Sequence, residues 1–286
     1  NPATYTHSAS GFKRVFAYST LGVDFANLYD SSGADIFTVR VSPTREATLT
    51  DLGDNYRLTV NGFVNIVATA TGGFDTATLY DSPGNDLFEA TSTSAKLYRQ
   101  GVYLSQAKSF DLVLAQASSG YDQAFLYDSR GNDLFDATPS YGRLVGPGFS
   151  NKATYFDAVH AYSVNGGSDV AKFRGSSGND TFTGRPQQST MTGPGPYGSY
   201  TNRAKYFKTV MADAGEGSND VADLYDSSQQ CRLDAQGTWA RLYDLALTFS
   251  NRVDKFDRVN AHASHPGNQK NIQDPLAYIL WLDGPW

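Results

Sequence analysis

The chain has little of several things, and each shortage excludes a class of protein. It carries one cysteine, Cys231, so no internal disulfide can form. Its longest apolar run, Leu276–Leu282, covers seven residues and is too short to cross a bilayer. Its 23 basic residues are outnumbered by 29 acidic ones and form no cluster, so the net charge is −6. We therefore expect no disulfide scaffold, no membrane span and no nucleic-acid partner.

Glutamate is nearly absent from the sequence. It occurs only at Glu46, Glu89 and Glu216, so 26 of the 29 acidic residues are aspartate. Aspartate favours turns and disfavours helix interiors. The chain is rich instead in glycine, tyrosine and phenylalanine, with 27, 18 and 17 residues. Because no segment has apolar residues at helical spacing over about a dozen positions, the sequence predicts an all-β fold.

One twelve-residue motif recurs along the chain and sets its organisation. Residues 79–90 read LYDSPGNDLFEA, and related segments begin at residues 28, 126, 173 and 224, with spacings of 51, 47, 47 and 51. A small residue followed by x-Leu, or by x-Met at residues 189–191, comes after each copy. Similarity at a nearly fixed period identifies a repeat protein. A further motif, related to Phe-Asp-x-Val-x-Ala, precedes the copies and begins at Phe12, Phe63, Phe110, Phe156, Phe207 and Phe256.

The repeat covers nearly the whole chain, so we expect a single repeat domain over residues 1–286. Each full unit contains four short segments in which apolar and polar residues alternate, separated by Gly-rich turns. Period-2 alternation predicts strands, hence four strands per unit. The units are 1–11 (partial), 12–62, 63–109, 110–155, 156–206, 207–255 and 256–286 (partial).

Two architectures accommodate such a unit: a repeat β-solenoid, similar to a parallel β-helix, and a six-bladed β-propeller. The first segment of each unit keeps small residues on one face, while the other face varies, as at Phe16, Leu114, His160 and Met211. One constant face suits a narrow interior, whereas both faces of a propeller blade pack against neighbours. We therefore predict the solenoid, with the propeller as the alternative, and expect equivalent residues of successive units to stack in columns.

The two ends of the chain depart from the repeat. The sequence begins at Asn1 rather than Met, and we expect a processed protein or a piece of a longer array. Residues 2–7 align with a fourth strand, whereas the last unit should hold a first strand at 256–263 and a second at 277–282 only. Open solenoid ends expose unpaired backbone groups. We therefore expect head-to-tail self-assembly into a filament or surface layer.

The whole unit resembles the long LYDS-x-G-N-D-x-F arrays of large bacterial extracellular surface proteins of the planctomycete type. Within it, residues 176–184 (SSGNDTFTG) are distantly similar to the RTX nonapeptide, which binds calcium in a parallel β-roll. RTX nonapeptides occur in tandem, whereas this chain has one such motif per unit. The resemblance spans nearly the whole chain and implies an extracellular or cell-surface location and a structural or adhesive role. It does not imply a catalytic site.

Aspartates at fixed positions of the repeat are candidate calcium ligands. Calcium takes about six to eight oxygen ligands, and carboxylates stacked in register repel one another unless cations or N–H donors intervene. The competing interpretation is that each aspartate caps its own turn by accepting backbone N–H groups. The candidate ligands are Asp30, Asp35, Asp81, Asp86, Asp128, Asp133 and Asp180, with Asp226 in a degraded copy.

The sequence contains no recognisable catalytic set. Catalytic residues should be exceptions to the repeat, yet exceptions such as Glu216 and His160 form no known combination. His262 and His265 would point to opposite faces of a strand, and Cys231 replaces a turn residue. We therefore expect a structural or adhesive protein rather than an enzyme. The alternatives are a carbohydrate-active β-helix lyase or hydrolase, or a carbohydrate-binding module, with polysaccharide or cell-surface glycans as partners.

Overall fold

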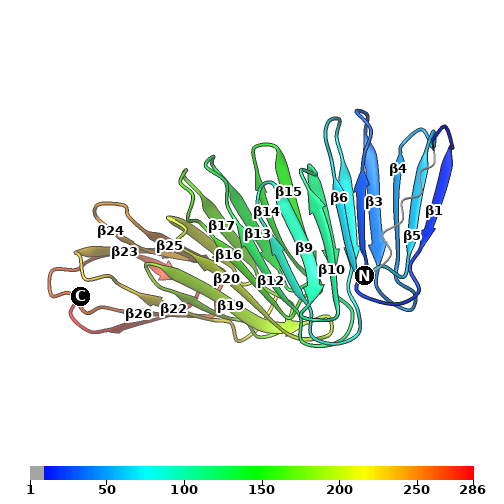
Figure 1. Cartoon of the computed structure of the whole chain (residues 1–286). Helices are drawn as coiled ribbons and strands as arrows, with labels where there is room; N and C mark the ends of the chain where they lie inside the picture. Colours follow the sequence, from blue (N-terminus) through cyan, green and yellow to red (C-terminus); the bar gives the residue numbers. More distant parts are fainter. Residues whose placement is uncertain (1–9) are drawn as a thin grey trace.

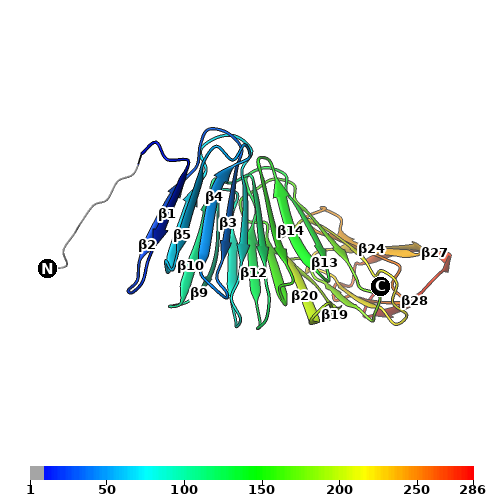
Figure 2. The ribbon, with the colours of Figure 1, turned by 90° about the vertical axis from the view of Figure 1, so that its right-hand side faces the viewer.

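The alternating segments become strands because one residue of each pair is apolar and turns inward. The computed structural model describes residues 10–286, and none of these residues is helical. Its strands form coils stacked along one axis from the N-terminal to the C-terminal end (Figure 1), which gives an elongated body in side view (Figure 2). The chain is a β-solenoid, which confirms the predicted class. Over residues 10–286 no helix is long and apolar enough to cross a membrane.

Two sheets make up the solenoid, and each follows the axis from the N-terminal to the C-terminal coil. In spatial order, sheet 1 contains β1 (Arg14–Tyr18), β5 (Arg57–Asn61), β4 (Glu46–Asp51), β3 (Asp35–Arg40), β7 (Thr76–Tyr80), β11 (Leu112–Gln116), β15 (Phe149–Thr154), β14 (Tyr141–Gly146), β13 (Leu134–Thr138), β17 (Val170–Arg174), β21 (Thr209–Asp213), β25 (Ser250–Asp254), β24 (Trp239–Asp244), β23 (Cys231–Gly237) and β27 (Gln269–Leu276). In the same order, sheet 2 contains β2 (Phe25–Tyr29), β6 (Asn65–Thr69), β10 (Tyr103–Lys108), β9 (Ser94–Arg99), β8 (Leu87–Ala90), β12 (Gln123–Tyr127), β16 (Ala158–Tyr162), β20 (Gly198–Lys205), β19 (Gln188–Gly195), β18 (Thr181–Gly184), β22 (Val221–Tyr225), β26 (Arg258–His262) and β28 (Ile279–Asp283).

Each full repeat contains five strands, so the prediction of four was wrong. The overlooked strand is the last of each unit, for example β10, whose burial pattern alternates like that of its neighbours. The third, fourth and fifth strands form an antiparallel meander within one sheet. Pairs between coils are parallel, as in the run β3–β7–β11–β15. This parallel stacking excludes the six-bladed propeller, whose blades are antiparallel sheets.

Successive repeats start in opposite sheets. The chain crosses to the other sheet after the first, second and fifth strands of a unit. Because this number of crossings is odd, the next unit begins in the opposite sheet. The first strands β11 and β21 therefore lie in sheet 1, whereas β16 lies in sheet 2. The predicted columns were consequently wrong. Asp30 follows a strand of sheet 2 and Asp81 follows one of sheet 1, so these equivalent residues lie at opposite edges of the solenoid.

The interior between the sheets holds leucine and phenylalanine as well as alanine. The third strand of four units contributes a phenylalanine that is 0% exposed. Each packs against the phenylalanine that begins the unit two repeats later, with ring centroids 6.0–6.2 Å apart. Because alternate units share a sheet orientation, this contact ties them together across the core. The pairs are Phe37–Phe110, Phe88–Phe156, Phe135–Phe207 and Phe182–Phe256.

Turns of neighbouring coils come so close that only glycine fits. At Gly167, where φ is +92°, an added Cβ would lie 1.8 Å from the carbonyl oxygen of Gly131. At Gly120, where φ is +133°, the corresponding distance to the oxygen of Gly84 is 2.3 Å. Glycine in these turns thus permits both a left-handed backbone conformation and direct backbone contact between coils.

The predicted ends need one correction. The partial unit expected at 1–11 falls largely on residues 1–9, which are outside the described part of the chain. In the last unit, the second strand is β27, and β28 is a third strand that pairs with β26. The sequence had assigned residues 277–282 to the second strand and predicted no third one. The polar sequence QKNIQDPL of β27 hides its strand character, because its alternation is weak.

Candidate functional site

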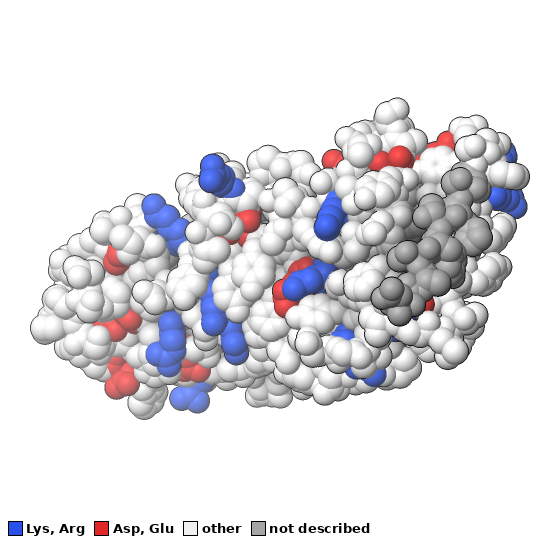
Figure 3. All heavy atoms as spheres, viewed as in Figure 1, with Lys and Arg blue, Asp and Glu red and all other residues white. Residues whose placement is uncertain are grey.

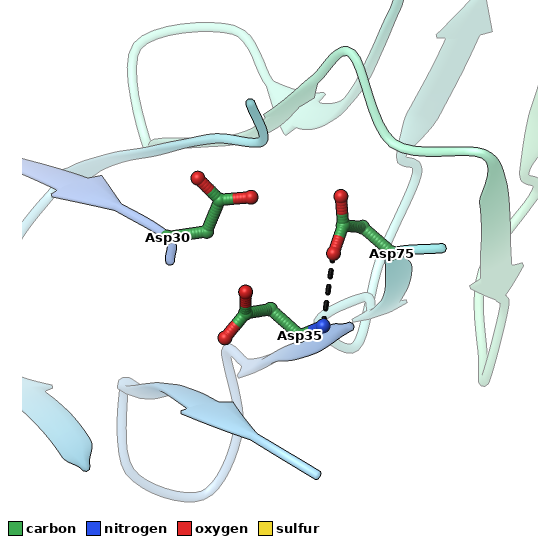
Figure 4. A group of neighbouring side chains, drawn as sticks. All are labelled: Asp30, Asp35 and Asp75. Atoms are coloured by element: carbon green, nitrogen blue, oxygen red, sulfur yellow. Dashed lines mark hydrogen bonds between the residues drawn. The ribbon is translucent and has the colours of Figure 1, made fainter. Parts of the chain in front are cut away.

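Within residues 10–286, three groups of three aspartates stand at the turns where the chain passes from one sheet to the other. In each group, one carboxylate oxygen per residue lies within 4.8 Å of the others. Figure 4 shows the first group, in which the side chains come from the end of β2, the start of β3 and the turn before β7. The triads are Asp30–Asp35–Asp75, Asp81–Asp86–Asp122 and Asp128–Asp133–Asp169.

The first aspartate of each triad caps a turn in the following repeat. The Asp30 carboxylate accepts the backbone N–H of Thr71 at 2.8 Å and its hydroxyl at 2.7 Å. The Asp128 carboxylate accepts the N–H groups of Val164 and Asn165, both at 2.9 Å. Residues some 36–41 positions apart are joined in this way, so the first aspartate fastens one coil to the next.

The second aspartate closes its own turn. In the third repeat, the Asp133 carboxylate accepts the backbone N–H of Ser129 at 2.9 Å and its hydroxyl at 3.0 Å. Asp180 forms the same pair of bonds with Ser176, and a buried tyrosine hydroxyl, that of Tyr200, donates to it at 2.6 Å. These contacts are those of an Asx-type turn, which was the competing interpretation of the sequence motif.

The third aspartate, which sequence reasoning did not select, bridges two coils. The backbone N–H of Asp86 donates to the Asp122 carboxylate at 2.7 Å, and the N–H of Asp122 donates to Asp157 at 2.8 Å. The result is a ladder in which each carboxylate accepts the N–H at the start of a strand in the preceding coil. The signal in the sequence was the fixed place of this residue directly after each Gly-rich turn. Its equivalents are Asp75, Asp169 and Asp220.

Crowding of the carboxylates changes their acidity. Burial, with repulsion from Asp81 and Asp86, raises the pKa of Asp122 to about 7. Burial and the neighbouring Asp86 carboxylate raise the pKa of Asp81 to about 6, against hydrogen bonds from Ser118 that lower it. Burial likewise raises the pKa of Asp169. Each triad therefore holds negative charge that a proton or a cation would relieve.

The second triad already has a basic neighbour. Nη2 of Arg99 lies 3.2 Å from Asp86 Oδ2 and donates to the Ser82 hydroxyl at 2.7 Å. The Tyr103 ring is 3% exposed and lies beneath the Arg45 guanidinium, 5.3 Å from the ring centroid. No contact to an arginine or lysine side chain is found for the carboxylates of the first and third triads within residues 10–286.

The fourth and fifth repeats lack a complete triad. Gly175 stands where the first aspartate would be, which leaves Asp180 and Asp220 as a pair joined by a 2.7 Å hydrogen bond. In the fifth repeat, Cys231 replaces the second aspartate and its N–H donates to Asn268 Oδ1 at 2.8 Å. Of the predicted metal ligands, the structure thus groups all but Asp180 and Asp226 into triads. Asn268 shows that the ladder position needs an oxygen acceptor rather than a charge.

Within residues 10–286, the histidines and the cysteine singled out in the sequence are not brought together. His262 stacks on Tyr225 at 4.4 Å on the outer face of sheet 2, whereas His265 lies in a turn, where its Nδ1 accepts the N–H of Gly267. Burial raises the pKa of the Cys231 thiol, which disfavours a nucleophilic thiolate. Burial beside the basic strand β20 lowers the pKa of His160 to about 4, so it is neutral at pH 7.

Comparison with known proteins supplies no relative: no protein-family model, curated protein or solved structure matches this chain.

Proposed function

We propose that this chain is an extracellular structural and adhesive solenoid whose first and third aspartate triads bind calcium ions. The observation that carries the proposal is the convergence of three carboxylates within 4.8 Å at the same place in alternate turns. Oxygens bound to one calcium ion at about 2.3–2.6 Å can be at most about 5 Å apart, so the spacing suits a shared ion. Calcium would relieve the repulsion that otherwise favours protonation.

Repetition of the site supports a structural role. The same turn chemistry recurs along the solenoid. A bond between coils stabilises the structure at every repeat, whereas a catalytic centre is needed only once. Each ion would join residues from two consecutive repeats, since Asp75 belongs to the unit after Asp30 and Asp35. Calcium would therefore stiffen the rod at the ion concentrations found outside cells, in keeping with the surface location that the repeat's resemblance implies.

Calorimetric titration of the EDTA-treated full chain tests the calcium proposal. Two ions should bind, because Arg99 competes for the second triad. The variant Asp128→Gly copies the natural Gly175 and should bind one ion, while Arg99→Gln should bind three. Asp226→Gly is the matched control, because its triad already lacks the second carboxylate, and it should still bind two. No calcium-dependent rise in melting temperature, or two ions in Asp128→Gly, would contradict the proposal.

We propose in addition that copies associate end to end through their outer coils. On β28, Ile279 and Trp281 are 65% and 58% exposed, and at the other end Phe16 and Phe25 are 55% and 66% exposed. A strand at the open edge of a sheet exposes unpaired backbone groups, which are a template for pairing with another chain. Sheet 1 is less suited to this at its C-terminal edge, since Lys270 stands in β27 opposite the core residue Leu233, and inward charges discourage edge pairing.

Light scattering over a range of protein concentrations tests this association. Wild-type protein should grow in mass with concentration, and Trp281→Lys should shift this growth to higher concentration. Val164→Lys, at a loop position that is 54% exposed, adds the same charge elsewhere and should behave as wild type. A constant monomer mass at every concentration would refute the proposal.

A further inference from the structure

The outer face of sheet 1 is unusually basic in its C-terminal half. On adjacent strands from β15 to β24, the central row of outward side chains includes five cations. This stretch crosses six strand spacings, about 29 Å along the solenoid axis. The protein as a whole has a net charge of −6, so the row departs from the general surface. The five cations are Lys152, Arg143, Lys172, Arg252 and Arg241.

A groove of about 340 Å³ opens at the centre of this row. Met211, on β21, is 37% exposed and forms its floor, with Lys172 on one neighbouring strand and Arg252 on the other. The two cations are two strand spacings apart, about 9.6 Å. Asp213 and Asp254 also line the groove, so it offers cations, carboxylates and an apolar patch side by side.

Two basic side chains of the groove are not engaged in ion pairs within the described residues. Arg252 is 3.4 Å from Asp254, and Lys255 is 2.8 Å from Asp213. Across residues 10–286, neither Lys172 nor Arg174 takes part in an ion pair. Both side chains are exposed and line the groove. Asp254 and Asp213 are thus engaged by other bases, and Asp136 accepts the Tyr141 hydroxyl, which leaves Lys172 and Arg174 to meet anionic groups of a ligand.

Aromatic rings flank the groove on both sides. Tyr141 donates to Asp136 at 3.0 Å and lies under Lys152, whose Nζ is 4.3 Å from the ring centroid. Trp239 lies under Arg252, 4.8 Å from its centroid. These cation–π contacts hold the side chains extended over the sheet, so the row is partly ordered before any ligand arrives. On the face drawn in Figure 3, basic side chains form small separate groups within a mostly uncharged surface.

We propose that this groove binds an acidic polysaccharide lying along the solenoid axis. A uronate carboxylate passing over β17 would pair with both Lys172 and Arg174, sugar hydroxyls would donate to the groove's aspartates, and a ring face would cover Met211. A nucleic acid fits less well, because Asp136, Asp213 and Asp254 would repel a continuous phosphate backbone. This inference deepens the adhesive part of the proposed function by naming its ligand class, and it does not depend on calcium.

Binding of the full chain to immobilised polygalacturonate, dextran and single-stranded DNA at low salt tests the proposal. We expect binding to polygalacturonate, none to dextran and weaker binding to DNA, with affinity falling as salt is added. The double variant Lys172→Gln/Arg174→Gln should lose affinity for polygalacturonate about tenfold or more. The control Lys108→Gln/Arg258→Gln removes two exposed charges from sheet 2 and should bind as wild type does.

Three results would overturn the proposal: no binding of wild type to polygalacturonate, equal losses in the two double variants, or tighter binding to DNA. Met211→Glu supplies a second check, because a negative charge on the groove floor should also weaken polygalacturonate binding. Melting curves confirm that each variant is folded. If polygalacturonate does not bind but calcium binds with the expected stoichiometry, the glycan proposal is wrong and the proposal of a calcium-binding structural solenoid is unaffected.

Discussion

Replacement of Asp122 separates the hydrogen-bonding role of the ladder from its charge. The side chain is 1% exposed and accepts the N–H of Asp86 at 2.7 Å. Alanine would leave that buried N–H unpaired, which costs about 1–3 kcal/mol. Asparagine keeps an oxygen acceptor, as Asn268 does at the equivalent place, where it accepts the N–H of Cys231 at 2.8 Å. At pH 5 we therefore expect Asp122→Asn to be at least as stable as wild type and Asp122→Ala to be less stable than Asp122→Asn.

The charge makes the comparison depend on pH. Burial raises the pKa of Asp122 from 3.8 to about 7. Because the folded-state pKa is the higher one, wild type loses stability as pH rises from about 4 to about 7. The shift corresponds to roughly 4 kcal/mol at most, and solvent screening reduces it to about 1–2 kcal/mol. Asp122→Asn does not titrate, so at pH 8 it should be more stable than wild type by that amount.

Urea unfolding in EDTA at pH 5 and pH 8, followed by circular dichroism, measures both effects. The second triad suits this experiment because Arg99 already contacts it. Equal stabilities of the alanine and asparagine variants at pH 5 would refute the hydrogen-bond argument. A difference between Asp122→Asn and wild type that does not change with pH would refute the charge argument.

Three further substitutions test packing and backbone geometry by thermal or urea unfolding. Gly167→Ala should destabilise by about 2 kcal/mol or more, since its Cβ would meet the Gly131 oxygen at 1.8 Å; wild-type stability would contradict the close contact. Phe135→Ala should cost about 3–5 kcal/mol, because the ring is 0% exposed in the core, and a loss below about 1 kcal/mol would contradict its clamping role. Ser109→Gly should stabilise by about 0.5–1 kcal/mol, since φ is +59° there and the equivalent residue is Gly62; a loss of stability would show that the serine side chain matters.

The class of fold could be predicted because period-2 alternation and a fixed repeat length are local properties of the sequence. Inward positions such as Ala77 and Leu79 are 0% exposed, as their alternation indicated. The fifth strand was missed because segments such as YLSQAK place polar residues among the inward positions, where Ser105 is 2% exposed. A buried serine interrupts the apolar alternation by which strands are recognised.

The arrangement of the site was only half predictable. The motif identified Asp81 and Asp86, whose positions within one turn are fixed by short-range geometry. It did not identify Asp122, which comes from the next unit and joins them only after the chain has crossed between sheets. The column prediction failed for the same reason. The number of crossings per unit depends on which turns fold back within a sheet, and that is decided by pairing between distant strands.

Chemical cross-linking tests the alternation of repeats between two sheets most directly. Thr78 and Leu114 are register neighbours on parallel strands of sheet 1, about 4.8 Å apart. Leu114 and His160 are equivalent in successive repeats but lie in different sheets. In a Cys231→Ser background, a short thiol-specific reagent should link cysteines at 78 and 114 and fail to link cysteines at 114 and 160. Linkage of 114 to 160 without linkage of 78 to 114 would contradict the architecture.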